Sequence, residues 1–496
     1  MKILFVYPSF PVTFWGFKYA LKFISKKSAS PPLGLLTVAA MLPEEWEKRF
    51  IDMNTTRLKD RHLRWADYVF ISGMALQRES AKMLIERCKK IGVKIVAGGP
   101  LFTTEYESFE GIDHFILGEA EDIMPQFIDD LRNGKAAHIY RQKEFPDITR
   151  TPVPLWQIVN KRKYSLMSVQ YSRGCPFNCE FCSVTALNGH KPRTKTAEQM
   201  INELESLYKW GWRDAVFFVD DNFIGNKRKL KEEVLPAIIE WMTKHRYPFT
   251  FSTQCSINLA DDEEMMELMV KAGFQTVFIG IETPNEASLS ECGKNQNVGR
   301  DMIANIKKIQ KAGIEVQAGF ILGFDNDPES IFVRLVEFIQ DTGIGTAMVG
   351  LLNAGKGSQL YQRLKSENRL LKETSGDNTD FSLNFIPKMD YKILIAGYKS
   401  VLSHIYSPRY YYERAKQFLK DFDPPRLRPV YFRFVHLKAF FKSIWYLGIV
   451  GKERLYYWRL FFWTLFKKPI LFPTAVTISI QGYHFRRVFE TQTRQR

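Results

Sequence analysis

The chain has few cysteines and no long uninterrupted run of apolar residues. Only 6 of its 496 residues are cysteines, and Cys88, Cys255 and Cys292 are scattered along it. A disulfide framework is therefore not expected. No stretch of about 18 consecutive apolar residues occurs, which argues against a membrane-spanning helix. The first eight residues contain too short an apolar run for a secretion signal, so we expect a cytoplasmic protein.

Acidic residues are scarce in the last fifth of the chain. Residues 403–496 contain 18 Lys and Arg but only 5 Asp and Glu, which accounts for most of the net charge of +16. Aromatic residues are frequent there, notably in Trp445–Val450 and Leu455–Pro469. This mixture suits a membrane interface with anionic lipid, although a docking element packed on the rest of the protein is the alternative. We expect peripheral binding to an anionic membrane surface, at the inner face of the cytoplasmic membrane.

Residues 1–140 alternate short apolar runs with helical patterns. The runs are Lys2–Tyr7, Lys48–Asp52, Tyr68–Ser72, Lys94–Ala97 and His114–Leu117. This rhythm predicts an α/β, doubly wound domain of flavodoxin-like type, which binds ligands beyond the carboxyl ends of its parallel strands. Gly98, Gly99 and Pro100 follow the fourth run. Glycines there let the backbone approach a flat ligand closely, although an ordinary turn is the alternative.

The rest of the chain divides into three parts by composition and pattern. Residues 141–163 form a linker rich in proline and charge. Residues 164–370 contain six further strand-and-helix units, which predict a partial (β/α)6 barrel with its active site at the carboxyl ends of the strands. Residues 371–496 lose this rhythm, and their fold is left unassigned.

Three cysteines follow the first strand of the predicted barrel. Cys175, Cys179 and Cys182 have the spacing C-x3-C-x2-C. Thiolates are the usual ligands of iron–sulfur clusters. Three of them can hold a four-iron cluster and leave one iron free to bind and polarise a small molecule. The alternative is a structural zinc site with His190 as the fourth ligand.

Further candidate residues lie at the predicted strand ends. Asp220 and Asp221 follow the second barrel strand, where they either bind a ligand or turn the chain into the next helix. Glu282 ends the fourth strand, and a carboxylate is costly to bury there without a function. Cys255 and Cys292 also fall near the carboxyl ends of the barrel strands. There they are candidates for a thiol that contacts the substrate, although a buried cysteine usually serves as a small apolar residue.

The cysteine segment resembles the radical S-adenosylmethionine (SAM) superfamily. In that family the open iron chelates SAM, and an electron from the cluster releases a 5′-deoxyadenosyl radical. The resemblance implies a [4Fe-4S] cluster on the three cysteines and an electron donor such as a reductase, flavodoxin or ferredoxin. It also implies SAM contacts from Asp220, Asp221 and Glu282, and an adenine-side motif at Gly319 and Gly323.

The domain order resembles the cobalamin-binding radical SAM proteins, the class B methylases and their relatives. Within that group several segments are similar to the hopanoid C-2 methylase family: Phe14–Phe23, Pro31–Pro43, Gly98–Phe102, Phe218–Lys227, Phe274–Thr283 and Cys292–Asn297. The resemblance implies cobalamin beside Gly98, Gly99 and Pro100. The motif Asp-x-His-x-x-Gly, whose histidine ligates cobalt in many cobalamin domains, is missing from residues 1–140. The resemblance therefore implies cobalamin bound without a histidine ligand, and the alternative is a domain that has lost cobalamin.

The resemblance implies methyl transfer to an unactivated carbon of a lipid such as a hopanoid. Alternatives on the same architecture are oxidative cyclisation of a tetrapyrrole and RNA modification, since basic and aromatic residues also suit single-stranded nucleic acid. Methylthiotransferases that modify RNA carry a second cysteine trio in the N-terminal domain, where this chain has only Cys88, so nucleic acid is not the favoured partner. A non-catalytic iron–sulfur membrane protein is a further alternative, against which the SAM-binding residues argue.

Overall fold

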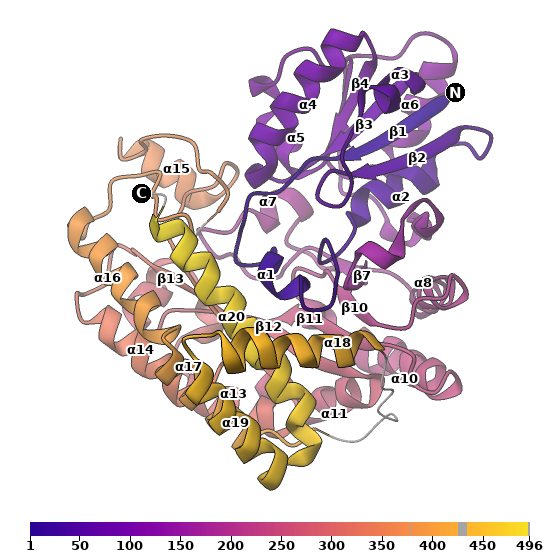
Figure 1. Cartoon of the computed structure of the whole chain (residues 1–496). Helices are drawn as coiled ribbons and strands as arrows, with labels where there is room; N and C mark the ends of the chain where they lie inside the picture. Colours follow the sequence, from indigo (N-terminus) through magenta and orange to yellow (C-terminus); the bar gives the residue numbers. More distant parts are fainter. Residues whose placement is uncertain (378, 425–433, 495–496) are drawn as a thin grey trace.

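The computed structural model contains two parallel α/β sheets followed by a helical C-terminal region (Figure 1). It describes residues 1–377, 379–424 and 434–494. The first sheet forms the upper domain of Figure 1, and the second sheet forms the lower one. The predicted α/β class and domain order are confirmed.

The first sheet has six parallel strands in the order β2-β1-β3-β4-β5-β6. Their bounds are Lys2–Tyr7 (β1), Glu47–Asp52 (β2), Tyr68–Ser72 (β3), Lys94–Gly98 (β4), His114–Leu117 (β5) and Ile139–Arg141 (β6). Five of the strands match the predicted runs. The three residues of β6 are too short a run to stand out in the sequence, and they cross the predicted domain boundary at residue 140.

Helices cover both faces of this sheet because its central strands are apolar throughout. In β1, Leu4 and Val6 pack on one face, while Ile3 and Phe5 pack on the other, as the alternation of a strand requires. One face is covered by α3 (Asp60–Trp65), α4 (Arg78–Ile91) and α5 (Pro100–Glu105), and the other by α2 (Leu33–Met41) and α6 (Ile123–Arg132). This two-sided cover is the doubly wound arrangement that the sequence predicts.

The second sheet has six parallel strands in the order β14-β13-β12-β11-β10-β7 and forms an open barrel. Their bounds are Leu166–Val169 (β7), Ala215–Phe218 (β10), Thr250–Cys255 (β11), Phe274–Glu282 (β12), Glu315–Leu322 (β13) and Ala347–Leu351 (β14). The longer helices between them are α8 (Ala197–Lys209), α10 (Leu235–Lys244), α11 (Glu263–Ala272), α13 (Met302–Lys311) and α14 (Ile331–Thr342). A short antiparallel pair, β8 (Ser172–Arg173) and β9 (Arg193–Thr194), flanks the cysteine segment.

The predicted linker is packed against both domains. It contains three short 3-10 turns, and Trp156 within it is completely buried. The Leu155 N–H donates to the Leu36 carbonyl of the first domain at 3.0 Å, and Trp156 belongs to the core of the barrel domain. The segment therefore fixes the domains to each other instead of serving as a free tether.

The C-terminal region is helical and returns to the start of the chain. Its helices are α15 (Gln359–Ser366), α16 (Tyr391–Ile405), α17 (Pro408–Asp421), α18 (Phe434–Ser443), the π-helix η10 (Ile444–Ile449), α19 (Arg454–Lys467) and α20 (Phe472–Arg494). Helix α20 lies beside α1 (Lys18–Leu21), as Figure 1 shows. The Phe14 and Phe485 rings stack with centroids 4.2 Å apart. Within the described residues, no helix is long and apolar enough to span a membrane.

Candidate active site

The three motif cysteines lie on one loop between β8 and α7 (Val184–Asn188), and none forms a disulfide. The Cys182 N–H donates to the Cys179 carbonyl at 3.0 Å. Gly174 precedes Cys175 with φ +95°, and a Cβ there would lie 2.8–3.0 Å from three backbone carbonyl oxygens. Only glycine fits this position without strain. Burial raises the pKa of the Cys182 thiol to about 11.

Two carboxylates at the carboxyl end of β10 hold the backbone of this loop. Asp220 is completely buried and accepts hydrogen bonds from the Ser172 hydroxyl at 2.6 Å and the Tyr171 N–H at 3.1 Å. Asp221 accepts from the Gly174 N–H at 3.1 Å. Burial raises the pKa of Asp220 to about 7. Both residues therefore position the cysteines, and a direct contact of either with SAM stays a prediction.

Glu282 ends β12 with φ +67° and forms a buried ion pair with Lys294, with Oε1 and Nζ 2.7 Å apart. Burial by itself would lower the pKa of Lys294, but Glu282, Cys179 and Cys182 outweigh it and raise that pKa. Lys294 thus places a positive charge beside Glu282, the carboxylate that is predicted to contact SAM, and within electrostatic reach of two of the motif cysteines. The sequence prediction did not include it, although it lies in the run Cys292–Asn297.

The two predicted adenine-side glycines have different roles in the fold. A Cβ on Gly319 would lie 2.9 Å from the Phe278 ring, so the glycine lets that ring lie across the strand. Gly323 has φ +104°, and its N–H donates to the Asp327 carboxylate at 2.9 Å. The Trp15 ring contacts Phe278 edge-on, with centroids 5.2 Å apart. An apolar surface therefore adjoins Gly319, and an adenine contact of either glycine stays a prediction.

Helix α15 holds the cysteine loop from the C-terminal side. Arg363 donates to Glu180, which lies between Cys179 and Cys182, at 2.6 Å, and to Asp325 at 3.0 Å. Burial would raise the pKa of Asp325, but its bonds with Arg369 and Arg363 outweigh this and lower it to about 2. This ion-pair network ties the loop to the region beyond the barrel.

A second, more buried network ties the loop to the first domain. Arg173, two residues before Cys175, pairs with Glu119 at 2.6 Å and with Glu121 at 2.8 Å. The side chains are only 14%, 7% and 2% exposed. Arg193 of β9 also pairs with Glu119. Because the two glutamates follow β5, the carboxyl edge of the first sheet faces the cysteine loop. This pairing was not predicted from the sequence.

The predicted cobalamin loop is closely packed. A Cβ on Gly98 would lie 2.9 Å from the Ile116 carbonyl, and one on Gly99, which has φ +85°, would lie 2.2 Å from the Ser72 hydroxyl. Pro100 begins α5. His62, His114 and His138 of this domain each have a backbone partner, namely the Lys59 N–H, the Ala137 carbonyl and the Asp113 carbonyl. These bonds engage the Nδ1 atom of each ring, and cobalamin binding without a histidine ligand stays a prediction.

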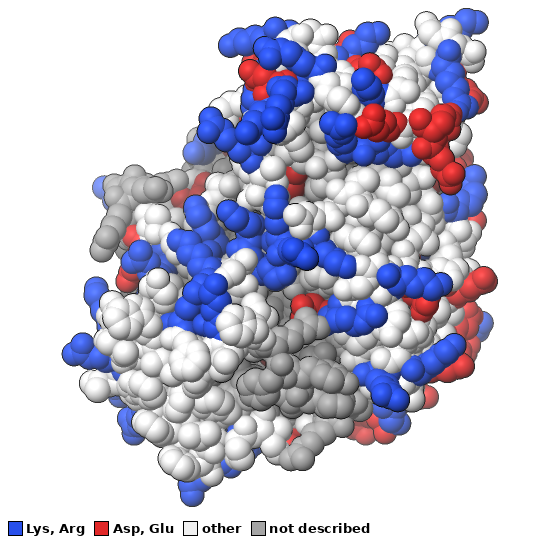
Figure 2. Space-filling model, turned by 45° about the vertical axis from the view of Figure 1, so that its right-hand side comes forward, with Lys and Arg blue, Asp and Glu red and all other residues white. Residues whose placement is uncertain are grey.

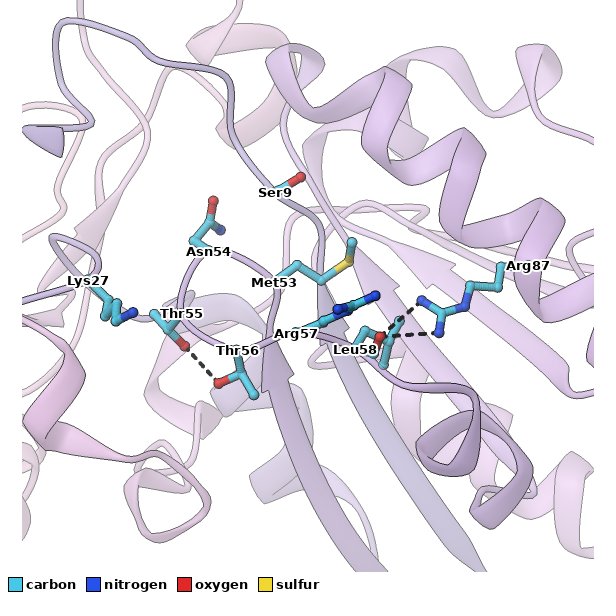
Figure 3. Close-up of a pocket in the computed structure, with 9 residues that line it drawn as sticks. All are labelled: Ser9, Lys27, Met53, Asn54, Thr55, Thr56, Arg57, Leu58 and Arg87. Atoms are coloured by element: carbon cyan, nitrogen blue, oxygen red, sulfur yellow. Dashed lines mark hydrogen bonds between the residues drawn. The ribbon is translucent and has the colours of Figure 1, made fainter.

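A separate polar cavity of about 440 Å³ lies where β1 and β2 end (Figure 3). Its lining is Ser9, Lys27, Met53, Asn54, Thr55, Thr56, Arg57, Leu58 and Arg87. Arg87 is already engaged, since it donates to the Leu58 carbonyl at 3.1 and 3.2 Å. None of the predicted site residues line this cavity.

The donor set fits a four-iron cluster better than zinc. Among the described residues, no group of three or more His, Cys, Asp and Glu side chains is placed to hold one metal ion. A single zinc needs all of its ligands within about 2.0–2.3 Å. A four-iron cluster instead receives each thiolate on a different iron. His190, the alternative zinc ligand, is exposed. Cys255 and Cys292 are buried, and burial raises the pKa of each thiol to about 12, which is typical of cysteines that serve as small apolar residues.

A doubly wound domain that faces a cysteine-bearing partial barrel defines a cobalamin-binding radical SAM enzyme. Residues 24–128 match the family model of the B12 binding domain, and residues 169–339 match that of the radical SAM superfamily. Residues 358–496 match a domain of unknown function, DUF4070. These domains imply a [4Fe-4S] cluster, SAM and cobalamin, as the sequence predicts.

The relatives define the family. The chain is 40% identical over 490 residues to an uncharacterised methyltransferase of Synechocystis sp., with 98% of this chain and 91% of the relative covered. It is 33% identical to the hopanoid C-2 methylase of Rhodopseudomonas palustris over 473 residues, 92% of this chain and 88% of the relative. The chain therefore belongs to the family of B12-binding radical SAM methyltransferases.

Solved structures confirm the fold. The radical SAM methyltransferase TsrM from Kitasatospora setae, with cobalamin and a [4Fe-4S] cluster bound, aligns with a TM-score of 0.62 at 14% identity and covers 89% of this chain and 98% of its own. The cobalamin-dependent enzyme OxsB aligns with a TM-score of 0.62 at 13% identity and covers 100% of this chain and 80% of its own. At these identities the likeness concerns the fold alone.

Proposed function

We propose that this methyltransferase acts on an unactivated carbon of a polycyclic lipid, with C-2 of a hopanoid as the leading candidate. The observation that carries the proposal is the 33% identity to hopanoid C-2 methylase over 92% of the chain. The few residues outside this alignment can account for only a small part of the C-terminal region. The resemblance therefore includes the part that lies outside the cofactor domains.

The chain's own residues position the substrate and the cofactors relative to one another. When bound, the cluster and SAM provide the radical that removes a hydrogen atom, and cobalamin provides the methyl group. An unactivated carbon offers no polar handle, so selectivity depends on how rigidly the substrate is held between the cofactors. Arg173 ties the cysteine loop to the cobalamin domain, and the rings of Trp15 and Phe278 form an apolar surface beside Gly319 of the barrel.

Electrons must reach the cluster from outside the chain. We propose a reductase, flavodoxin or ferredoxin as the donor, because one-electron reduction of an iron–sulfur cluster requires a low-potential partner. The proposal can be tested by measuring SAM cleavage with each donor system in turn.

Expression in a hopanoid-producing strain that lacks its own C-2 methylase tests the substrate. The expected result is 2-methylhopanoid in the lipid extract, detected by mass spectrometry. A variant with the three motif cysteines changed to Ala is the control and should yield none. Absence of methylated hopanoid, with purified wild-type protein that cleaves SAM and binds corrinoid, would refute the hopanoid assignment while leaving the methyltransferase class intact.

A tetrapyrrole is the second candidate substrate. The chain is 26% identical over 355 residues to the bacteriochlorophyllide d C-12(1)-methyltransferase of Chlorobaculum tepidum, 70% of this chain and 76% of that enzyme. Such a substrate is also large and apolar. Incubation of the reconstituted protein with a chlorophyllide and methyl-labelled SAM distinguishes the two, because label in the pigment would favour the tetrapyrrole.

A further inference from the structure

The helices α18, η10 and α19 form an antiparallel hairpin on the outside of the C-terminal region (Figure 1). The Ser443 and Tyr457 hydroxyls are 2.9 Å apart across it. The Trp458 indole N–H donates to the Gly448 carbonyl at 2.9 Å. The hairpin packs inward on α17 and α20. It is therefore a fixed part of the fold whose outer face has no partner within the described part of this chain.

That outer face is apolar. In the first arm Ala439, Ser443 and Leu447 are buried. Leu437, Phe441 and Trp445 are each two residues away from one of these buried positions, which is about 200° around the helix. They therefore lie on the opposite, outer side, where Phe441 and Trp445 are 60% and 57% exposed.

The second arm repeats the pattern. Tyr457, Leu460 and Thr464 are buried, whereas Phe462 and Phe466 on the other side are exposed, Phe466 by 74%. Ile449 and Val450 at the turn are exposed as well. A monomeric soluble protein rarely exposes so many large apolar side chains in one place, and such a patch marks an interaction surface.

The charge around this face has one sign. Residues 434–471 contain seven basic residues: Lys438, Lys442, Lys452, Arg454, Arg459, Lys467 and Lys468. Their one acidic residue, Glu453, is buried and paired with Arg486. Figure 2 shows a broad white area at lower left, where these helices lie, with a band of Lys and Arg above it. An apolar face whose own segment, residues 434–471, exposes only basic charges is complementary to anionic lipid.

We propose that the outer face of this hairpin docks on an anionic lipid bilayer, with Phe441, Trp445, Phe462 and Phe466 inserted at headgroup depth and the surrounding Lys and Arg against the lipid phosphates. This assigns a function to part of the region that matches a domain of unknown function. The inference concerns where the enzyme works and does not depend on which lipid it methylates.

Substitutions test this better than truncation. Removal of the chain beyond residue 440 would delete α20, whose Phe485 packs on Phe14 in the core. The apolar variant combines Phe441→Ser, Trp445→Ser, Phe462→Ser and Phe466→Ser. The charge variant combines Lys438→Glu, Lys452→Glu, Arg454→Glu and Lys467→Glu. The matched control carries Met83→Ser and Val333→Ser, two residues that are similarly exposed on other helices.

The probe is a set of vesicles of phosphatidylcholine with or without phosphatidylglycerol, with binding measured by co-sedimentation. Wild type and control should bind the anionic vesicles, and added salt should weaken but not abolish binding. Each hairpin variant should partition at least tenfold more weakly while it retains wild-type circular dichroism and SAM cleavage in solution. The proposal is overturned if the wild type does not bind, or if the apolar variant binds equally. Self-association through this face without vesicle binding would also overturn it.

Discussion

Replacement of Arg173 by Met should uncouple the cysteine loop from the cobalamin domain. The guanidinium lies 2.6 Å from Glu119 and 2.8 Å from Glu121, and none of the three side chains is more than 14% exposed. Met has a similar volume but no charge, so most of the space stays filled. Glu119 keeps Arg193 as a charged partner, whereas Glu121 keeps a hydrogen bond from the Thr151 hydroxyl, at 2.8 Å.

The expected loss of stability is large because a buried carboxylate loses its charge partner. Breaking a buried ion pair from one side costs about 3–5 kcal/mol. Arg150 provides the matched control, since its pair with Asp122 joins side chains that are 63% and 47% exposed. Such a surface pair contributes about 0–1 kcal/mol, so Arg150→Ala should be nearly neutral.

The pH dependence gives an independent check. Burial would raise the pKa of Glu121, but Arg173 outweighs it and lowers that pKa below the ordinary 4.5. A carboxylate with a lowered pKa stabilises the fold above its unfolded pKa, and this contribution is lost as the pH falls through the folded value. The difference between wild type and Arg173→Met should therefore be largest near pH 7 and narrow below pH 4.5.

The assay is urea denaturation under anaerobic conditions, followed by tryptophan fluorescence. The double variant Arg173→Met with Glu121→Leu should recover part of the lost stability, because no unpaired charge is left at Glu121. If Arg173→Met unfolds at the same urea concentration as Arg150→Ala, or if the double variant is no more stable than the single one, the network does not join the domains energetically.

Three further predictions concern the cofactor loops. Changing all three motif cysteines to Ala should abolish the visible absorbance of the cluster and all SAM cleavage, and a variant that retains its iron would contradict the ligand assignment. Gly99→Ala should destabilise the first domain by about 1–3 kcal/mol more than Gly92→Ala. Both glycines have a positive φ, but of the two only the new Cβ at Gly99 would meet a side-chain atom, at 2.2 Å. Gly99→Ala should also reduce corrinoid uptake, measured by the cobalamin absorbance of reconstituted protein. The raised pKa of Asp220, about 7, means that its stabilising contribution is present below the unfolded value of 3.8 and is lost as the pH rises toward 7. Compared with Asp220→Asn, the wild type should therefore lose about 2 kcal/mol of stability between pH 5 and pH 7, and parallel pH profiles in urea denaturation would refute this.

The sequence by itself determined the architecture and identified the three cysteines that are predicted to hold the cluster. Short apolar runs between helical patterns are local signals, and five strands of the first sheet lie where those runs predict them. The spacing of Cys175, Cys179 and Cys182 is also local, since one loop carries all three. The absence of a histidine motif from the first 140 residues likewise required no structure.

Only the tertiary structure decided which partners these residues have. Asp220 and Asp221 are predicted from the sequence as cofactor contacts, and the structure adds that they accept hydrogen bonds from the backbone of Tyr171 and Gly174, about fifty residues earlier in the chain. The pairing of Arg173 with Glu119 and of Lys294 with Glu282 depends on how strands and loops distant in sequence come together. The exposure of Phe441 and Phe466 also depends on packing, because the aromatic runs contain both buried and exposed rings. Periodicity reports the face of one helix or strand, whereas ion pairs and surfaces arise from long-range packing that no local pattern encodes.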